Sequence, residues 1–193
     1  MLLQACASIP RLDAVPPALT ERAAISGIPN SRYWLDRDLA PFIRDAIQDT
    51  KRESEALAEA GKPVDPLPPA NLLAISGGGD AGAFAAGILA GWSAHRDRPA
   101  FKVVTGVSAG ALIAPFAFLG PQYDDVIRNV ATSIGPKDVF PARNRLAGLA
   151  SDGMADIGPL QRLVAKYITP EVLAAIAREY RTGRVLQIGN DRP

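Results

Sequence analysis

Residues 101–110 read Phe-Lys-Val-Val-Thr-Gly-Val-Ser-Ala-Gly, an apolar run that leads into a serine between two glycines. The run up to Val107 is short and apolar, as buried parallel strands are, and residues 109–118 after it have the composition of a helix. Ser108 therefore stands in a G-x-S-x-G pattern at a strand-to-helix turn. This junction predicts an α/β fold.

The residue types at this turn indicate a nucleophile. In a nucleophile elbow the serine sits on a strained backbone, and flanking glycines such as Gly106 and Gly110 avoid clashes with neighbouring segments. The positive end of the helix that follows stabilises negative charge developing near the serine hydroxyl. The alternative is a packing turn in which Ser108 is buried.

A second glycine motif, Gly77-Gly-Gly-Asp-Ala-Gly82, lies between an apolar strand over 71–76 and an alanine-rich helix over 80–92. Backbone N–H groups at such a junction converge on an anion. The motif fits a tight turn, a dinucleotide site of the G-x-G-x-x-G type, or an oxyanion hole. A dinucleotide site needs a carboxylate at the end of the second strand, but Asp97 precedes that strand. An oxyanion hole is therefore the favoured interpretation.

The two motifs are expected at one edge of the sheet. A single helix joins the two strands, so the strands run parallel and their carboxyl ends meet. The N–H groups of Gly78 and Gly79 would then face an oxygen on the carbon that Ser108 attacks. Asp80 and Gly82 complete this glycine loop.

The rest of the chain extends the sheet and surrounds it. We expect helices over 122–133, 159–167 and 170–181, a loop over 136–151 and a third strand over 184–189. The expected fold is a parallel-rich sheet flanked by helices in a catalytic domain over 70–193. Residues 1–69 form an N-terminal extension that contains an irregular proline-rich stretch, one charged helix from Pro41 to Glu59 on the outside, and a stiff linker over 62–69.

Composition narrows the function. The chain has 21 Lys and Arg against 20 Asp and Glu, so it lacks the basic excess of nucleic-acid-binding domains. One Cys and one His exclude a disulfide framework and a metal site built on either residue, and no cofactor is implied. A Ser-His-Asp triad would have His95 as its only base. No stretch reaches the length of about 20 apolar residues that a membrane helix needs.

The N-terminus, Met1-Leu-Leu-Gln-Ala-Cys6-Ala-Ser8, is similar to the end of a bacterial lipoprotein signal, in which small residues precede a lipidated cysteine. Lipidation of Cys6 would need a start site upstream and would place the protein at the cell envelope. The alternative is an incidental cysteine in a cytoplasmic protein.

Together these motifs resemble the patatin-like phospholipase family, and most closely its bacterial lipoprotein branch. The similarity continues through Ala83–Trp92 and Ala111–Gly120. It implies a three-layer fold related to the α/β-hydrolases and a serine carboxylic-ester hydrolase that acts on lipids or esters. A membrane surface is a further candidate partner. It also implies Ser108 as the nucleophile of a Ser–Asp dyad and Gly77–Gly79 as the oxyanion hole. A dyad explains how a chain with one histidine can be a serine hydrolase.

Two departures from the family pattern bear on activity. Ala81 replaces a basic residue that many members carry in the glycine loop. The dyad aspartate belongs to an Asp-Gly-Gly or Asp-Gly-Ala motif well downstream of the serine, whereas Asp152-Gly153-Met154 comes early and Asp191 lies in a polar tail. We therefore expect the chain to end before this motif. The alternative function is a catalytically silent remnant or a lipid-binding module.

Overall fold

The structure, a computed structural model of the full chain, describes residues 31–34, 36–78, 82–133 and 158–189, together with Pro16, Leu19 and Arg22. It divides into two compact units, Met1–Asp45 and Ala46–Pro193. The division falls inside helix α1 (Leu39–Glu59), so the second half of this helix belongs to the larger unit. A catalytic domain that begins at residue 70 remains a prediction.

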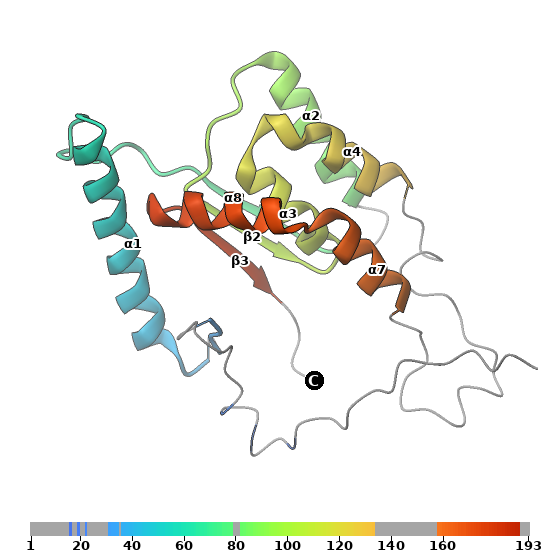
Figure 1. Ribbon diagram of the computed structural model, residues 1–193, viewed down its shortest axis with the longest axis horizontal. Helices are drawn as coiled ribbons and strands as arrows, with labels where there is room; N and C mark the ends of the chain where they lie inside the picture. Colours follow the sequence, from blue (N-terminus) through green and yellow to red (C-terminus); the bar gives the residue numbers. More distant parts are fainter. Residues whose placement is uncertain are drawn as a thin grey trace, which may run out of the picture. The chain divides into compact units, whose positions relative to one another are not determined.

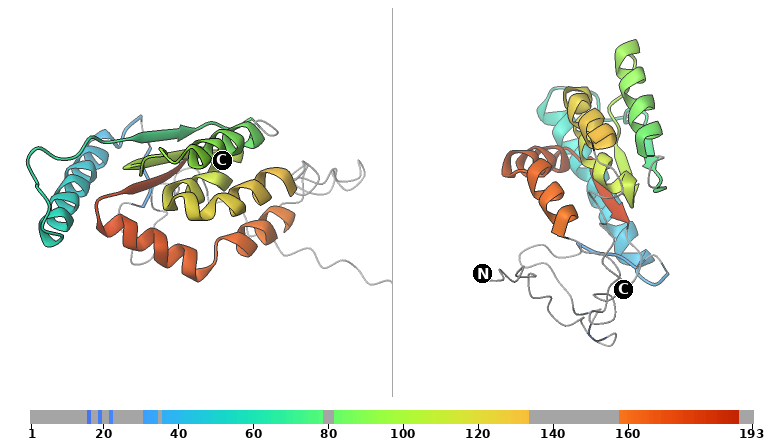
Figure 2. Two further views of the ribbon diagram at one scale, coloured as in Figure 1. Left: turned by 90° about the horizontal axis from the view of Figure 1, so that it is seen from above. Right: turned by 90° about the vertical axis from the view of Figure 1, so that its right-hand side faces the viewer.

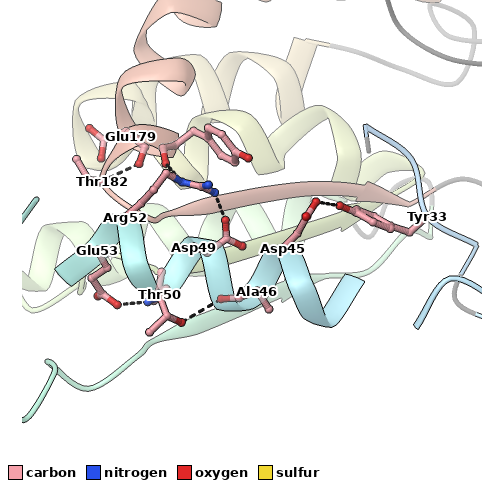
Figure 3. Close-up of polar contacts among 11 residues, drawn as sticks. Tyr33, Asp45, Ala46, Asp49, Thr50, Arg52, Glu53, Glu179 and Thr182 are labelled. Carbon is pink, nitrogen blue, oxygen red and sulfur yellow. Dashed lines mark hydrogen bonds and ion pairs between the residues drawn. The ribbon is translucent and has the colours of Figure 1, made fainter. Parts of the chain in front are cut away.

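The described part of the smaller unit contains the start of α1. The ring of Tyr33 packs edge-on against Phe42 with 5.6 Å between centroids, and its hydroxyl donates to the Asp45 carboxylate (Figure 3). The helix begins at Leu39, two residues before the expected Pro41. Proline is tolerated there because the first N–H groups of a helix have no intrahelical partner.

The larger unit alternates strands and helices after α1 (Figure 1). Its elements are β1 (Leu72–Ile75), α2 (Gly82–His95), β2 (Val103–Val107), α3 (Ala109–Leu119), the 3₁₀ turn η3 (Pro121–Tyr123), α4 (Asp124–Ser133), α7 (Gly158–Tyr167), α8 (Pro170–Arg181) and β3 (Val185–Gly189). Every strand and helix expected within the described residues after 70 is present, with bounds shifted by a few residues. The expected loop over 136–151 lies outside the described residues.

The strands form one parallel sheet in the order β1-β2-β3. Leu73 pairs with Val104, which pairs with Leu186 on its other side, so these three side chains share a face. Helix α3 contacts all three strands, and α8 contacts β3 and α3 (Figure 2). The expected α/β fold with parallel strands flanked by helices is confirmed.

The core is centred on α3. Ile113, Phe116 and Phe118 on this helix are at most 2% exposed, and they pack with Val104 from β2 and Ile127 from α4. Burial of side chains of this size stabilises a fold by about 1.5–3 kcal/mol each. Helices α2, α4 and α8 also contact α3, so it is covered along most of its length. Ser108, which directly precedes α3, is therefore attached to the best-packed helix among the described residues.

The second half of α1 lies at the amino ends of the strands. Glu53 pairs with Lys102, which directly precedes β2, and Arg52 donates to the Tyr180 carbonyl of α8 at 3.2 Å (Figure 3). The Arg52 guanidinium also stacks on the Tyr180 ring at 4.1 Å. Helix α1 has no buried residue, which confirms that it lies on the outside. In the described part of the chain, no helix has the length and apolar character needed to cross a bilayer.

Candidate active site

Ser108 occupies a strained turn between β2 and α3. Its φ is 53° and its ψ is −123°, a conformation that residues other than glycine rarely adopt. Such strain persists only where the surrounding structure holds it, and it is concentrated at functional sites. Ser108 is exposed, which differs from the buried serine of a packing turn. The turn therefore presents the hydroxyl to solvent at the carboxyl end of β2.

Backbone packing around the turn explains its two glycines. A Cβ placed on Gly106 would lie 2.6 Å from the Ala114 Cβ and 2.6 Å from the Gly110 carbonyl oxygen. A Cβ on Gly110 would collide with the Ile75 carbonyl oxygen and lie 2.8 Å from that of Ser76. These neighbours are mostly main-chain atoms, which cannot turn away as a flexible side chain can. Both positions therefore require glycine if the turn is to keep its shape.

The glycine loop after β1 lies against Ser108. A Cβ on Gly77 would be 2.7 Å from the Ser108 Cβ and 3.4 Å from its Oγ. Gly78 has a φ of 127°, which suits glycine alone. Gly82, the first residue of α2, faces the Ala109 Cβ, 3.4 Å from the point where its own Cβ would be. The two motifs thus meet at the carboxyl edge of the sheet.

The local field at this edge favours negative charge. Helix α3 starts directly after Ser108, and its first turn contains no acidic residue. The Ser108 hydroxyl makes no capping hydrogen bond among the described residues, and the Ala111 N–H donates to the Ser108 carbonyl at 2.9 Å. The positive end of the α3 dipole therefore lies at the serine without a carboxylate in the first turn to offset it.

His95 lies away from this edge. It is the last residue of α2, whose first residue is Gly82, and a helix of 14 residues is about 20 Å long. Its side chain is 78% exposed, and its Nδ1 lies 3.0 Å from Asp97. The histidine therefore belongs to the surface near the start of β2 and not to the Ser108 turn.

Several predicted positions lie outside the described residues. These are Gly79, Asp80 and Ala81 of the glycine loop, the aspartates Asp152 and Asp191, and Cys6. Among the described residues, no group of three or more His, Cys, Asp or Glu is placed to hold a metal ion.

Residues 73–188 match the sequence model of the patatin-like phospholipase family. The match starts in β1 and ends in β3, so it spans the sheet, both glycine motifs and more than half of the chain. The chain belongs to the patatin-like phospholipase family. Comparison with curated proteins and with solved structures finds no significant match. Family membership supports a lipid acyl hydrolase that acts on lipid substrates.

The patatin-like domain also contains contacts that were not predicted from sequence. Arg98 and Arg184 donate to the carbonyls of Ala117 and Phe118, in the last turn of α3. Each arginine stands in the polar connection before a strand, and no periodic pattern distinguishes it from the arginines of the surface. Their role depends on which segments meet in the folded chain.

Proposed function

We propose that this patatin-like domain hydrolyses acyl esters of lipids, with Ser108 as the nucleophile. The observation that carries the proposal is the exposed Ser108 at positive φ, at the carboxyl end of β2 and in contact with Gly77. This arrangement supports a reaction in which one carbonyl group is approached from two sides. The serine hydroxyl attacks its carbon, and backbone N–H groups bind its oxygen.

The proposed reaction has two halves. The Ser108 Oγ forms a bond to the ester carbonyl carbon as its proton passes to a base, and the oxyanion is held by N–H groups of the loop Gly77–Gly79. Each such donor is typically worth about 3–4 kcal/mol in the transition state. The tetrahedral intermediate then expels the alcohol, which takes up the proton. Water attacks the acyl-serine in the second half, releasing the fatty acid and the free serine.

The proposed base is the aspartate of the dyad that the family resemblance implies, and no aspartate of the described residues is assigned to this role. His95 does not fit this role, because α2 carries it away from the edge where Ser108 lies. An unassisted serine hydroxyl is almost fully protonated at neutral pH and is a weak nucleophile. The rate of the first half-reaction therefore depends on this base as well as on the oxyanion donors.

A second candidate function is lipid binding without turnover. The observation that favours it is that His95, the single histidine of the chain, lies exposed at the opposite end of α2 from the Ser108 turn and so does not serve as its base. In that case the glycine loop would bind the carbonyl oxygen of a lipid, and the serine would not react. The same experiment separates the two functions.

The test is covalent labelling by a fluorophosphonate, which reacts with activated serines. We expect the wild-type chain to be labelled and Ser108→Ala to be inert. Ser54→Ala on α1, whose hydroxyl bonds the Thr50 carbonyl at 3.1 Å, is a matched control that should label normally. Hydrolysis of p-nitrophenyl esters of increasing acyl length would then define the substrate. A folded wild-type chain that takes up no label contradicts the hydrolase and favours the binding module.

A further inference from the structure

The C-terminal end of α3, which is the end far from Ser108, is held by hydrogen bonds from several segments. The last four carbonyls of a helix have no intrahelical partner. In α3 each of the four has a donor: the Gly120 N–H for Phe116 at 3.1 Å, Arg98 for Ala117 at 3.0 Å, Arg184 for Phe118, and Gln122 for Leu119 at 2.6 Å. Two of these donors are guanidinium groups from other segments, so this end is tied to more than its own chain neighbours.

Arg98 approaches from the connection between α2 and β2. Its side chain is only 1% exposed, and besides the Ala117 carbonyl it reaches Asp124 at 2.7 Å and the Ser93 hydroxyl at 3.1 Å. Its Nε is buried without a hydrogen-bond partner among the described residues. Replacing a whole buried ion pair by apolar residues is often neutral for stability, so the Arg98–Asp124 pair is weak evidence of a net stabilising role. Removing Arg98 alone would leave Asp124 without this partner and is expected to cost stability, so a test of its role must separate positioning from stability.

Arg184 approaches from the residue before β3. Its guanidinium donates to the carbonyls of Phe118 and Phe101, the latter at 2.8 Å, and pairs with Glu179 at 2.6 Å. It also lies over the Phe118 ring at 4.5 Å, while Arg98 lies 5.8 Å from the Phe101 ring. Phe101 stands just before β2. The two arginines therefore join the beginning of β2 to the end of α3.

These contacts connect the two ends of the β2–α3 segment, whose central turn carries Ser108. Strand β2 runs into the turn and α3 runs back from it, so the angle between them sets the position of the serine against Gly77. Helix α3 has 11 residues and is about 16 Å long, and a small tilt at its far end therefore shifts its N-terminus. The strained φ of Ser108 gives the turn a tendency to relax if this angle is released.

We propose that Arg98 and Arg184 are positioning residues that clamp the far end of α3 and so hold Ser108 in its strained, reactive position. The proposal rests on Ser108 being the nucleophile. The planar guanidinium is required because it serves a carbonyl and a carboxylate at the same time in a fixed geometry. A lysine ammonium carries the charge but does not reproduce the planar arrangement of hydrogen-bond donors in a guanidinium.

The experiment compares Arg98→Met, Arg184→Met and the matched control Arg128→Met, whose arginine is 58% exposed and pairs with Asp125 on its own helix. Two quantities are measured: the rate constant for fluorophosphonate labelling, and amide hydrogen exchange in the peptide 104–112. We expect each clamp variant to label about tenfold to a hundredfold more slowly and to exchange faster in this peptide, with residues 158–166 of α7 unchanged. Arg128→Met should match the wild type in both.

Chemical rescue separates positioning from bulk stability. Arg98→Ala should recover labelling and exchange protection when guanidinium is added at millimolar concentration, because the deletion leaves a cavity of the right shape. Arg98→Met, in which the side chain fills that space, should not recover. Arg98→Lys, which keeps bulk and charge, should fold and label at an intermediate rate.

The outcomes distinguish the two proposals. If the wild type does not label, the nucleophile proposal fails, and exchange in the peptide 104–112 alone decides the clamp. If both methionine variants lower the melting temperature but leave exchange in 104–112 as in the wild type, the clamp is overturned and the arginines are structural only. Failure of guanidinium to rescue Arg98→Ala also counts against the clamp.

Discussion

The two edges of the sheet are built from opposite kinds of residue. At the carboxyl edge, glycines at 77, 106 and 110 let backbone segments approach within contact distance of one another around Ser108. At the amino edge, the long charged side chains of Arg98, Lys102 and Arg184 span the segments and pair with carboxylates. At the carboxyl edge the absence of side chains on these glycines sets the geometry. At the amino edge long side chains fill the space between the segments. The carboxyl edge thus allows close backbone contacts around Ser108, and the amino edge fixes the segments to one another at a distance from Ser108.

The largest expected effect comes from adding one methyl group at the carboxyl edge. Gly110→Ala should destabilise the fold by about 3 kcal/mol, because its Cβ meets the backbone carbonyls of Ile75 and Ser76 at the end of β1 and cannot be accommodated by side-chain movement. Labelling of Ser108 should fall by about a hundredfold or more in the molecules that remain folded. Urea unfolding and fluorophosphonate kinetics measure the two effects. Near-wild-type values for both would show that the turn is less tightly enclosed than the structure indicates.

A glycine-to-alanine substitution can also be made at the amino edge of the sheet, at Gly183. Gly183 has a φ of 82°, and its Cβ would collide with the Asp49 carbonyl oxygen and lie 2.6 Å from the Glu53 nitrogen. Gly183→Ala should cost about 2 kcal/mol and raise hydrogen exchange in residues 46–59, because α1 must move away.

Gly61→Ala is the control for this substitution. Its φ of 67° is also positive, but no atom of the described residues lies within 4 Å of the added Cβ. It should cost only the conformational strain of about 1 kcal/mol. Equal losses for the two variants would mean that the Gly183 contact with α1 contributes nothing.

A glycine inside α2 should respond with the opposite sign. Gly91 has a helical conformation, and a Cβ there would have no neighbour within 4 Å among the described residues. Gly91→Ala should therefore stabilise the fold by about 0.5–1 kcal/mol through helix propensity and the unfolded chain's entropy. Urea unfolding at several protein concentrations measures this gain. A loss of stability would show that another surface covers this face of α2.

The smallest expected effect is electrostatic and lies at the start of α8. The Thr169 hydroxyl, followed by the Glu171 backbone N–H, hydrogen-bonds to the Glu171 carboxylate and lowers its pKa. Because the folded-state pKa is lower than the unfolded one, ionised Glu171 stabilises the fold above about pH 4.3, and this contribution is lost as pH falls through the folded value. Glu171→Gln should therefore lower the melting temperature slightly at pH 7 and leave it unchanged at low pH.

Substitutions at Thr169 separate its two roles. Thr169→Val should raise the pKa of Glu171 in an NMR titration and also remove the N-cap of α8, since the Thr169 oxygen accepts from the Val172 N–H at 3.4 Å. Thr169→Ser keeps the hydroxyl and should preserve both. An unchanged pKa in Thr169→Val would show that the backbone N–H alone lowers it.

Prediction from sequence succeeded where the signal was local. The strands and helices between Leu72 and Gly189 follow from apolar runs and helical composition, and the meeting of Gly77 with Ser108 follows from parallel topology. The start of α1 was misplaced at Pro41 because proline in a first turn does not specify which position it holds. The Arg98 and Arg184 contacts were missed because each joins segments that are distant in sequence, up to 83 residues apart for Arg184 and Phe101.

The sequence by itself determined the family, the order of the elements and the serine at the turn, because these depend on composition and on neighbours a few residues away. The tertiary structure alone decided that α1 packs by its second half at the amino edge, that two arginines hold the end of α3, and that Gly183 is enclosed by α1. The physical reason is that a long charged side chain reaches several partners, and only the packed fold selects which carbonyl or carboxylate lies within its reach.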